Sequence, residues 1–199
     1  MAWRSKCLRD CIDDMKDAVT NIKPNISFSH NFHGYWIVNW RVGVTAEKFA
    51  ETSDYVTGET EGMCPSQLAR FERGVGGGKH YDVMTHRFVQ GWDFAVKPAE
   101  QLKFELFTAA ANGAGVTTID QPYHTGRLEP AVYDILEETY GEIEKKEQWL
   151  VDAEPVRFAA LYYSEKTKTY HAADDLGKYS AGFVGAYRAL MEQHKAVEI

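Results

Sequence analysis

The chain has 199 residues, of which 44% are hydrophobic, 13% aromatic and 26% charged. This composition provides for a sizeable folded core, and it excludes a disordered tail, a collagen-like repeat and a small disulfide-stapled protein. The formal net charge is -7. Because an acidic surface repels phosphate backbones, we expect no non-specific binding of nucleic acid.

The sequence also predicts where the protein resides. No apolar run approaches the roughly 20 residues that a membrane span needs, and the opening MAWRSKCLRDCIDDMKD is too charged for a signal peptide. Three cysteines, an odd and small number, indicate reduced thiols rather than a disulfide framework. We therefore expect a soluble, cytoplasmic protein with no membrane partner.

Apolar residues recur at three- and four-residue intervals over residues 5–23, which predicts an amphipathic helix. Pro24 ends it, because proline has no N–H and disfavours helix at the residue before it. The elements expected next are a strand at 26–31, an irregular functional loop at 33–53, a brief strand at 55–57, a helix at 66–73 capped by Ser66, and a strand at 80–85 after a glycine-rich loop.

The second half of the chain continues to alternate strands with helices. The elements expected there are a helix at 99–112 with Pro98 at its first turn, a buried strand at 116–119, a long helix at 129–147, a strand at 156–163, a helix at 178–194, and the opening of one more strand at 196–199. Such alternation indicates parallel α/β architecture. The four early strands would make half of a (β/α)8 barrel, and an open doubly wound sheet remains the alternative.

The first candidate for chemistry is the acidic turn TGETEG, which follows the strand at 55–57 and contains Glu59 and Glu61. Barrel enzymes keep their active sites at the carboxyl ends of their strands. A glycosidase needs one carboxyl there as general acid/base and a second as nucleophile or base. Glu59 and Glu61 are therefore candidate catalytic residues, and a solvated acidic turn is the alternative.

Polar and aromatic side chains follow the other predicted strands as well. Aromatic planes suit the apolar faces of sugar rings, and neutral hydrogen-bonding groups suit their hydroxyls, so these residues are candidates for substrate binding. Loops that pack their own aromatic side chains are the alternative. The candidates are His30, Asn31 and Trp36 after the first strand, His86, Arg87 and Trp92 after the third, and Asp120 and His124 after the fourth.

Two other patterns predict no site. The segment GVGGGKH at residues 74–80 resembles a phosphate-binding loop only in composition, because it lacks the required Ser or Thr after the lysine and precedes a strand. Cys7 and Cys11 share one helix face, but no further ligands lie near them in sequence. We expect neither a metal nor a cofactor.

Residues 54–149 resemble the catalytic barrel of α-L-fucosidase-like glycoside hydrolases. The likeness is to the group called hypothetical glycosyl hydrolase 6, with the family 29 and family 151 fucosidases as relatives. It is carried by DYVTGETEG, HYDVMTHRFVQGWDF, KPAEQLKFELFTAAANGAGVTTIDQP and GRLEPAVYDILEETYGEIEKKEQWL. The segment GKYSAGFVGAYRALMEQHKAVEI resembles the start of the flavodoxin-like trimerisation domain of family 42 β-galactosidases.

This resemblance implies a fold and a domain division. Residues 1–152 would form the C-terminal half of a TIM-barrel glycosidase domain, and residues 153–199 the beginning of a flavodoxin-like domain. It also implies that the full-length parent can be a homotrimer and that its partner is a carbohydrate. The segment DYVTGE matches an Asp-x-x-Thr segment that precedes the acid/base glutamate of the relatives, so Glu59 would take that role, with Glu61 as second choice.

The resemblance further implies that the relatives' nucleophile, a carboxylate at the end of the fourth barrel strand, has no counterpart here. We therefore expect a fragment of a glycosidase, acting on terminal fucosides or galactosides with retention, that alone shows negligible hydrolysis. A non-catalytic carbohydrate-binding or assembly module is the alternative function. An unrelated doubly wound domain would need a nucleotide fingerprint after the first strand, and ISFSHNFHG does not supply one.

Overall fold

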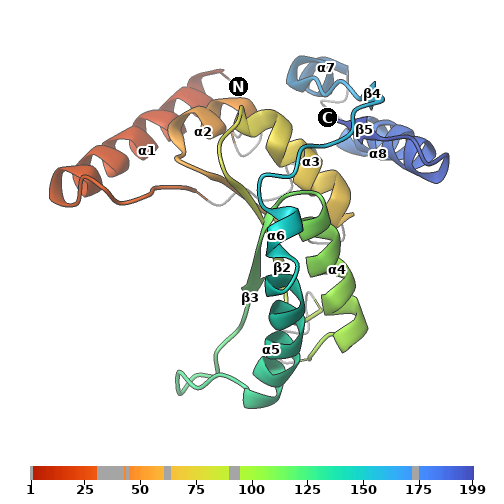
Figure 1. Ribbon diagram of the computed structural model, residues 1–199. Coiled ribbons are helices and arrows are strands. Elements are labelled where there is room, and N and C mark those ends of the chain that lie inside the picture. The colour runs from red at the N-terminus through yellow and green to blue at the C-terminus, as the bar shows by residue number, and fades with distance from the viewer. Residues whose placement is uncertain (1, 31–42, 44, 61–63, 90–94, 172–174) are drawn as a thin grey trace.

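The computed structural model describes residues 2–30, 43, 45–60, 64–89, 95–171 and 175–199. The chain begins with helix α1, Ala2–Ile22, which confirms the predicted helix and ends just before Pro24. Most of its predicted apolar stripe is nevertheless open to solvent. Ile12 is buried, whereas Met15 is 48% and Ile22 82% exposed, because α1 packs mainly against a single short helix and stands out from the rest (Figure 1).

That short helix, α2, spans Ala46–Thr52 and lies inside the segment that the sequence predicted to be an irregular loop. The prediction was wrong for these residues, since Phe49 is buried in the core. Lysines distant in sequence stabilise the carboxyl end of α2. Lys79 Nζ donates to the carbonyls of Ala50 and Ser53 at 2.5 and 2.7 Å, and Lys16 Nζ donates to the Thr52 carbonyl at 3.0 Å. The helix dipole favours cations at this end of a helix.

The first predicted strand, 26–31, is also corrected: residues 26–30 form no strand, and residue 31 lies outside the described part of the chain. This segment is instead attached to Asp54. The Asp54 amide donates to the Phe28 carbonyl at 2.7 Å, and the Asp54 carboxylate accepts from the Phe28 amide at 2.8 Å. The Asp54 side chain thus accepts a hydrogen bond that, between two paired strands, a backbone carbonyl would accept.

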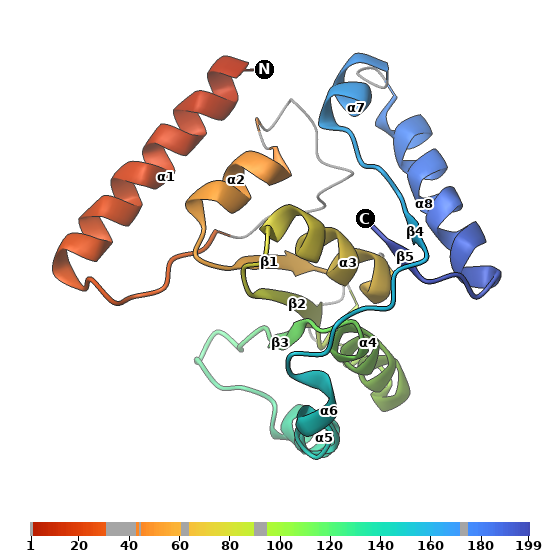
Figure 2. The same ribbon diagram turned by 45° about the horizontal axis from the view of Figure 1, so that its top comes forward.

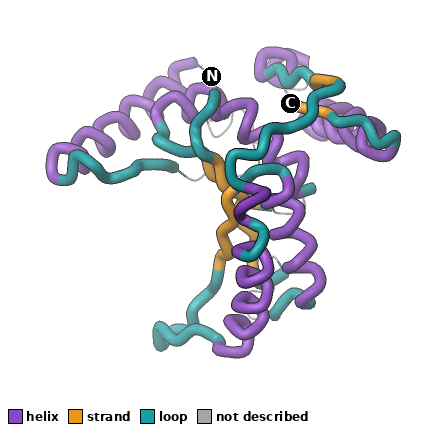
Figure 3. The backbone as a smooth tube through the Cα atoms, in the orientation of Figure 1, coloured by secondary structure: helices purple, strands orange, loops and turns teal. Residues whose placement is uncertain are grey.

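A three-stranded parallel sheet forms the centre of the described structure, in the order β1-β2-β3 (Figures 1 and 3). The strands are β1, Val56–Glu59, β2, Tyr81–His86, and β3, Gly115–Ile119. Val56 pairs with Tyr81, and Val83 pairs with Val116. The predicted strands at 55–57, 80–85 and 116–119 are therefore confirmed to within two residues, as is the parallel pairing that strand–helix alternation implied.

Helices α3, Pro65–Gly76, and α4, Ala99–Ala111, connect these strands and pack on one face of the sheet (Figure 2). Helix α5, Pro130–Glu144, and the short α6, Glu147–Leu150, follow β3, and α5 packs on α4. Ser66 does not cap α3 as predicted, because the helix already begins at Pro65, whose fixed φ suits a first turn. The helix ends where Gly77 takes the left-handed φ of 60°.

The core lies between this face of the sheet and the helices. Val56 and Val83 on the strands pack with Leu68 and Phe71 of α3, and all four are at most 1% exposed. Burial of side chains of this size contributes about 1.5–3 kcal/mol each. The predicted buried character of β3 was wrong, because all its residues are only half-buried. In the described part of the chain no strand pairs with its outer edge.

The last part of the chain forms a smaller parallel pair, β4, Ala159–Ala160, and β5, Val197–Glu198, connected through α7, Glu165–His171, and α8, Leu176–Glu192. The predicted strand 156–163 is reduced to two residues, and α7 was not predicted. This part packs on α3. The rings of Tyr163 and Phe71 meet edge to face with centroids 4.9 Å apart, and Arg73 Nη2 pairs with Glu198 at 2.6 Å.

Candidate functional site

The candidate site lies at the carboxyl ends of β1 and β2. Successive side chains on a strand point to opposite faces, so Glu59 and His86 lie on the face away from Val56 and Val83, which pack on α3. His86 Nε2 is 3.7 Å from Glu59 Oε2, and the side chains are only 11% and 12% exposed. The structure therefore brings together two of the predicted site residues. An ion pair forms between them only when His86 is protonated.

A buried polar cluster supports these strand ends from the helix side. Lys97 Nζ donates to Glu105 Oε2 at 2.7 Å and to Thr85 Oγ1 at 3.3 Å. Thr60 Oγ1 donates to Thr85 Oγ1 at 3.3 Å, and Thr85 in turn donates to Glu105. Because α4 provides Glu105, this cluster fixes the carboxyl ends of β1 and β2 to the first turns of α4. Buried polar groups satisfied in this way make a strand end rigid.

Arg87 and Asp120 also meet, but they bind one another. Arg87 Nε donates to Asp120 Oδ1 at 2.5 Å, and the Arg87 side chain is 1% exposed. Asp120 Oδ2 accepts a hydrogen bond from Tyr133 Oη of α5 at 3.1 Å. The pair thus lies toward the helix layer, on the other side from Glu59 and His86. Its observed contacts are structural, and substrate binding by Arg87 and Asp120 remains a prediction.

The structure places His30 elsewhere. Its Nε2 lies 3.1 Å from the Phe49 carbonyl and 3.1 Å from Ser53 Oγ, so His30 packs at the carboxyl end of α2, before β1 begins. Burial lowers the pKa of His30. His124 lies exposed in the loop 120–129 that follows β3. Four further candidates lie outside the described residues: Asn31, Trp36, Glu61 and Trp92.

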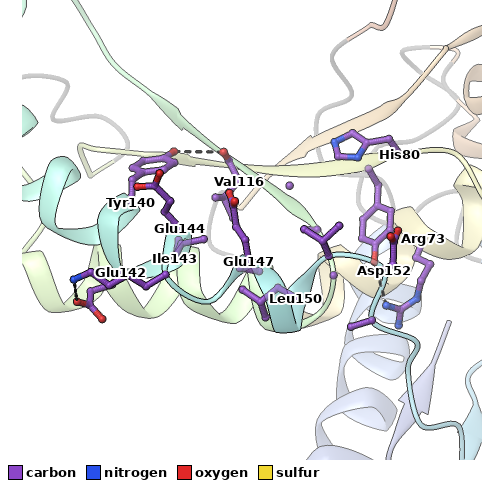
Figure 4. A pocket seen from close by; sticks show the side chains of 18 of the residues that line it. Arg73, His80, Val116, Tyr140, Glu142, Ile143, Glu144, Glu147, Leu150 and Asp152 are labelled. Carbon is purple, nitrogen blue, oxygen red and sulfur yellow. Dashed lines mark hydrogen bonds and ion pairs between the residues drawn. The ribbon is translucent and has the colours of Figure 1, made fainter.

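A groove of about 1180 Å³ lies at the opposite end of the sheet (Figure 4). His80 and Val116 line it at the amino ends of β2 and β3, with Glu144 and Leu150 on its α5–α6 side. None of the predicted site residues that the structure describes lines this groove. Parallel α/β proteins bind ligands at the carboxyl ends of their strands. We therefore locate the candidate site at Glu59 and His86 and not in this groove.

The described residues contain no group of three or more His, Cys, Asp and Glu side chains arranged to hold a metal ion. Within the same part of the chain, no helix combines the length and apolar character needed to cross a bilayer. Cys7, Cys11 and Cys64 are free and exposed.

The residues that support the site were not predicted from the sequence. Tyr133, Lys97 and Glu105 lie on or before helices, where charged and phenolic side chains usually face water. No spacing rule in the sequence singles them out. Thr85 could have been found, because strand alternation puts it on the same face as the buried Val83. A buried threonine there requires a polar partner.

The fold resembles that of alpha-L-fucosidase isoenzyme 2 from Paenibacillus thiaminolyticus, with a TM-score of 0.75 and 23% sequence identity, over 96% of this chain. The chain shares this part of the fucosidase's fold. It spans only 29% of the fucosidase chain. No protein-family model and no curated protein sequence matches the chain.

Proposed function

We propose that the chain is part of a glycoside hydrolase that removes terminal sugars, fucosides or galactosides, with Glu59 as the general acid/base. The observation that carries this proposal is the position of Glu59. It ends a parallel strand, is mostly buried and faces His86 at 3.7 Å. The fold is shared with part of a protein named as an α-L-fucosidase, which supports the same conclusion.

The chemistry follows from what hydrolysis of a glycosidic bond requires. A protonated carboxyl donates its proton to the leaving oxygen, and the resulting carboxylate then activates a water molecule. Retention requires a second carboxylate about 5–5.5 Å from the first, which acts as nucleophile. We assign only the acid/base role, to Glu59. His86, with Nε2 3.7 Å from Glu59 Oε2, is placed to interact with the Glu59 carboxyl group during the reaction.

The architecture that we propose follows the same resemblance. Strands β1 to β3 with α3 to α5 would be one wall of a (β/α)8 barrel within residues 1–152. Strands β4 and β5 with α7 and α8 would begin a flavodoxin-like domain within residues 153–199. Two observations support this division: both sheets are parallel, and their strands are connected through helices.

The test measures hydrolysis of aryl α-L-fucosides and β-D-galactosides by a longer glycosidase that contains this chain, by its Glu59→Gln variant and by a surface control, Glu192→Gln. General acid catalysis contributes about 100- to 10,000-fold, and poor leaving groups need it most. Glu59→Gln should therefore lower kcat/KM by about 100-fold or more for poorly activated aryl glycosides. The loss should be smaller when the leaving group is a good one. Glu192→Gln, on the solvent-facing side of α8, should retain the parent activity.

Three results would contradict the proposal in different ways. Full activity in Glu59→Gln would exclude Glu59 as the acid/base. Saturable sugar binding, followed by tryptophan fluorescence without any turnover, would favour the non-catalytic carbohydrate-binding module. If the protein neither hydrolysed nor bound either sugar, a carbohydrate function would be excluded.

A further inference from the structure

Arg87 is buried directly after β2, and its backbone is held on both sides. Its amide donates to the Ile119 carbonyl at 3.0 Å, and its carbonyl accepts from the Lys97 amide at 2.8 Å. The first bond reaches the end of β3, and the second reaches the residue that begins the approach to α4. The backbone of Arg87 is therefore fixed relative to the end of β3 and to the segment before α4.

The guanidinium group joins two segments of chain. Besides its bond to Asp120, Arg87 donates from Nη2 to the Gln121 carbonyl at 3.2 Å and from Nη1 to the Ala95 carbonyl at 3.3 Å. One acceptor lies in the segment after β2, and two lie directly after β3. A planar guanidinium presents several donors in a fixed fork, whereas a lysine ammonium provides only a point charge.

The segment that Arg87 binds is the root of the exposed loop 120–129. The tip of the loop closes on itself, because the Tyr123 amide donates to the Arg127 carbonyl at 2.9 Å and the Gly126 amide donates back to Tyr123 at 2.8 Å. Gly126 has a φ of 78°, which favours glycine at this turn. A turn closed by its own bonds is rigid in itself, but its direction depends on how its root is held.

Asp120 is the first residue of this loop and the one to which the Arg87 side chain binds. Burial alone would raise the pKa of Asp120, but hydrogen bonds from Arg87, the Gln121 amide and Tyr133 outweigh it and lower the pKa. The carboxylate therefore stays charged at neutral pH and keeps its bond to Arg87. Since Tyr133 belongs to α5, Asp120 connects Arg87, the loop and the helix layer at one point.

We propose that Arg87 is a positioning residue, which holds the loop 120–129 at the carboxyl end of the sheet where Glu59 and His86 lie. The loop carries His124, a predicted sugar-binding residue, so its direction sets where this side chain lies. The identity of the ligand, a terminal sugar, rests on the proposed function. The attachment of the loop does not.

The test compares amide hydrogen exchange in the parent protein, Arg87→Lys and Asp120→Asn. Charge-assisted hydrogen bonds are strong enough that losing one should speed exchange at the loop amides by about tenfold or more. We expect this at Gln121, whose amide is bonded to Asp120 at the root of the loop, while Tyr123 within the closed turn and the core amides of Val83 and Leu106 keep their exchange rates. In protein that turns over sugar, Arg87→Lys should raise KM for the glycoside more than it lowers kcat.

Two results would overturn the inference. Unchanged exchange in the loop of both variants would show that Arg87 does not hold it. Equal acceleration in loop and core would show that Arg87 only contributes to global stability. Failure of the proposed function would look different, because the parent protein would bind no sugar while its loop was still loosened in the variants.

Discussion

At the scale of single residues, strand alternation decides which polar side chains can meet. The sequence placed Glu59, His86, Arg87 and Asp120 at one edge of a sheet, and the structure confirms that edge for all four. It separates them into two pairs, however, one on each side of the sheet. The parity of residues beyond a strand end is not fixed by the sequence, so the pairing of Arg87 with Asp120 could not be predicted.

A second buried ion pair gives a stability prediction at this scale. Lys168 Nζ lies 2.9 Å from Glu165 Oε2 and donates to Tyr163 Oη at 2.8 Å, and its side chain is 1% exposed. Burial lowers the pKa of Lys168, although Glu165 acts in the opposite direction. Lys168→Met would leave the Glu165 carboxylate buried without its cation, which typically costs about 3–5 kcal/mol.

We therefore expect Lys168→Met to lower the free energy of unfolding in urea by about that amount. Lys166→Met is the matched control, because Lys166 lies exposed on the same helix. It should change the free energy by no more than about 0.5 kcal/mol. Equal effects of the two substitutions would show that the buried pair does not stabilise this part of the chain.

At the scale of elements, long periodic helices were predicted well and short ones were not. The helices at 5–23 and 99–112 were predicted nearly to their ends, because apolar spacing over several turns identifies a helix. α2 and α7 are too short to show such spacing. α2 also depends on Lys16 and Lys79, which cap it from elsewhere in the chain. The strand at 26–31 failed for a similar reason, since Asp54 holds that segment through its side chain.

One glycine gives a prediction about how elements dock. Gly74 lies in α3, where a Cβ would collide with the backbone carbonyl oxygen of Ile199, just after β5. Gly74→Ala should therefore lower the free energy of unfolding by about 1–3 kcal/mol, the usual cost of overpacking. Gly182→Ala in α8 meets no atom within 4 Å. It should instead raise stability by up to about 1 kcal/mol.

Thermal and urea unfolding of both variants measure this difference. A stabilised Gly74→Ala would show that β5 does not sit against α3 as closely as described. A destabilised Gly182→Ala would show that the outer face of α8 is covered by something else. Opposite signs for the two helical glycines are the expected result.

At the scale of the whole molecule, a parallel sheet with helices on one face and polar groups at its carboxyl ends accounts for the proposed sugar site. The sequence predicted this architecture because alternation of strands and helices is a global pattern. It could not predict the groove at the amino ends, which depends on how α5 and α6 lie against β3. Both ends of the sheet are therefore candidate ligand-binding sites.

The most direct measurement is to locate a bound sugar analogue, using an iminosugar related to L-fucose and a crystal structure of the complex. We expect the analogue within hydrogen-bond distance of Glu59 and His86. An analogue bound instead in the groove beside His80 and Glu144 would show that Glu59 is not part of the sugar site. It would move the functional site to the amino end of the sheet.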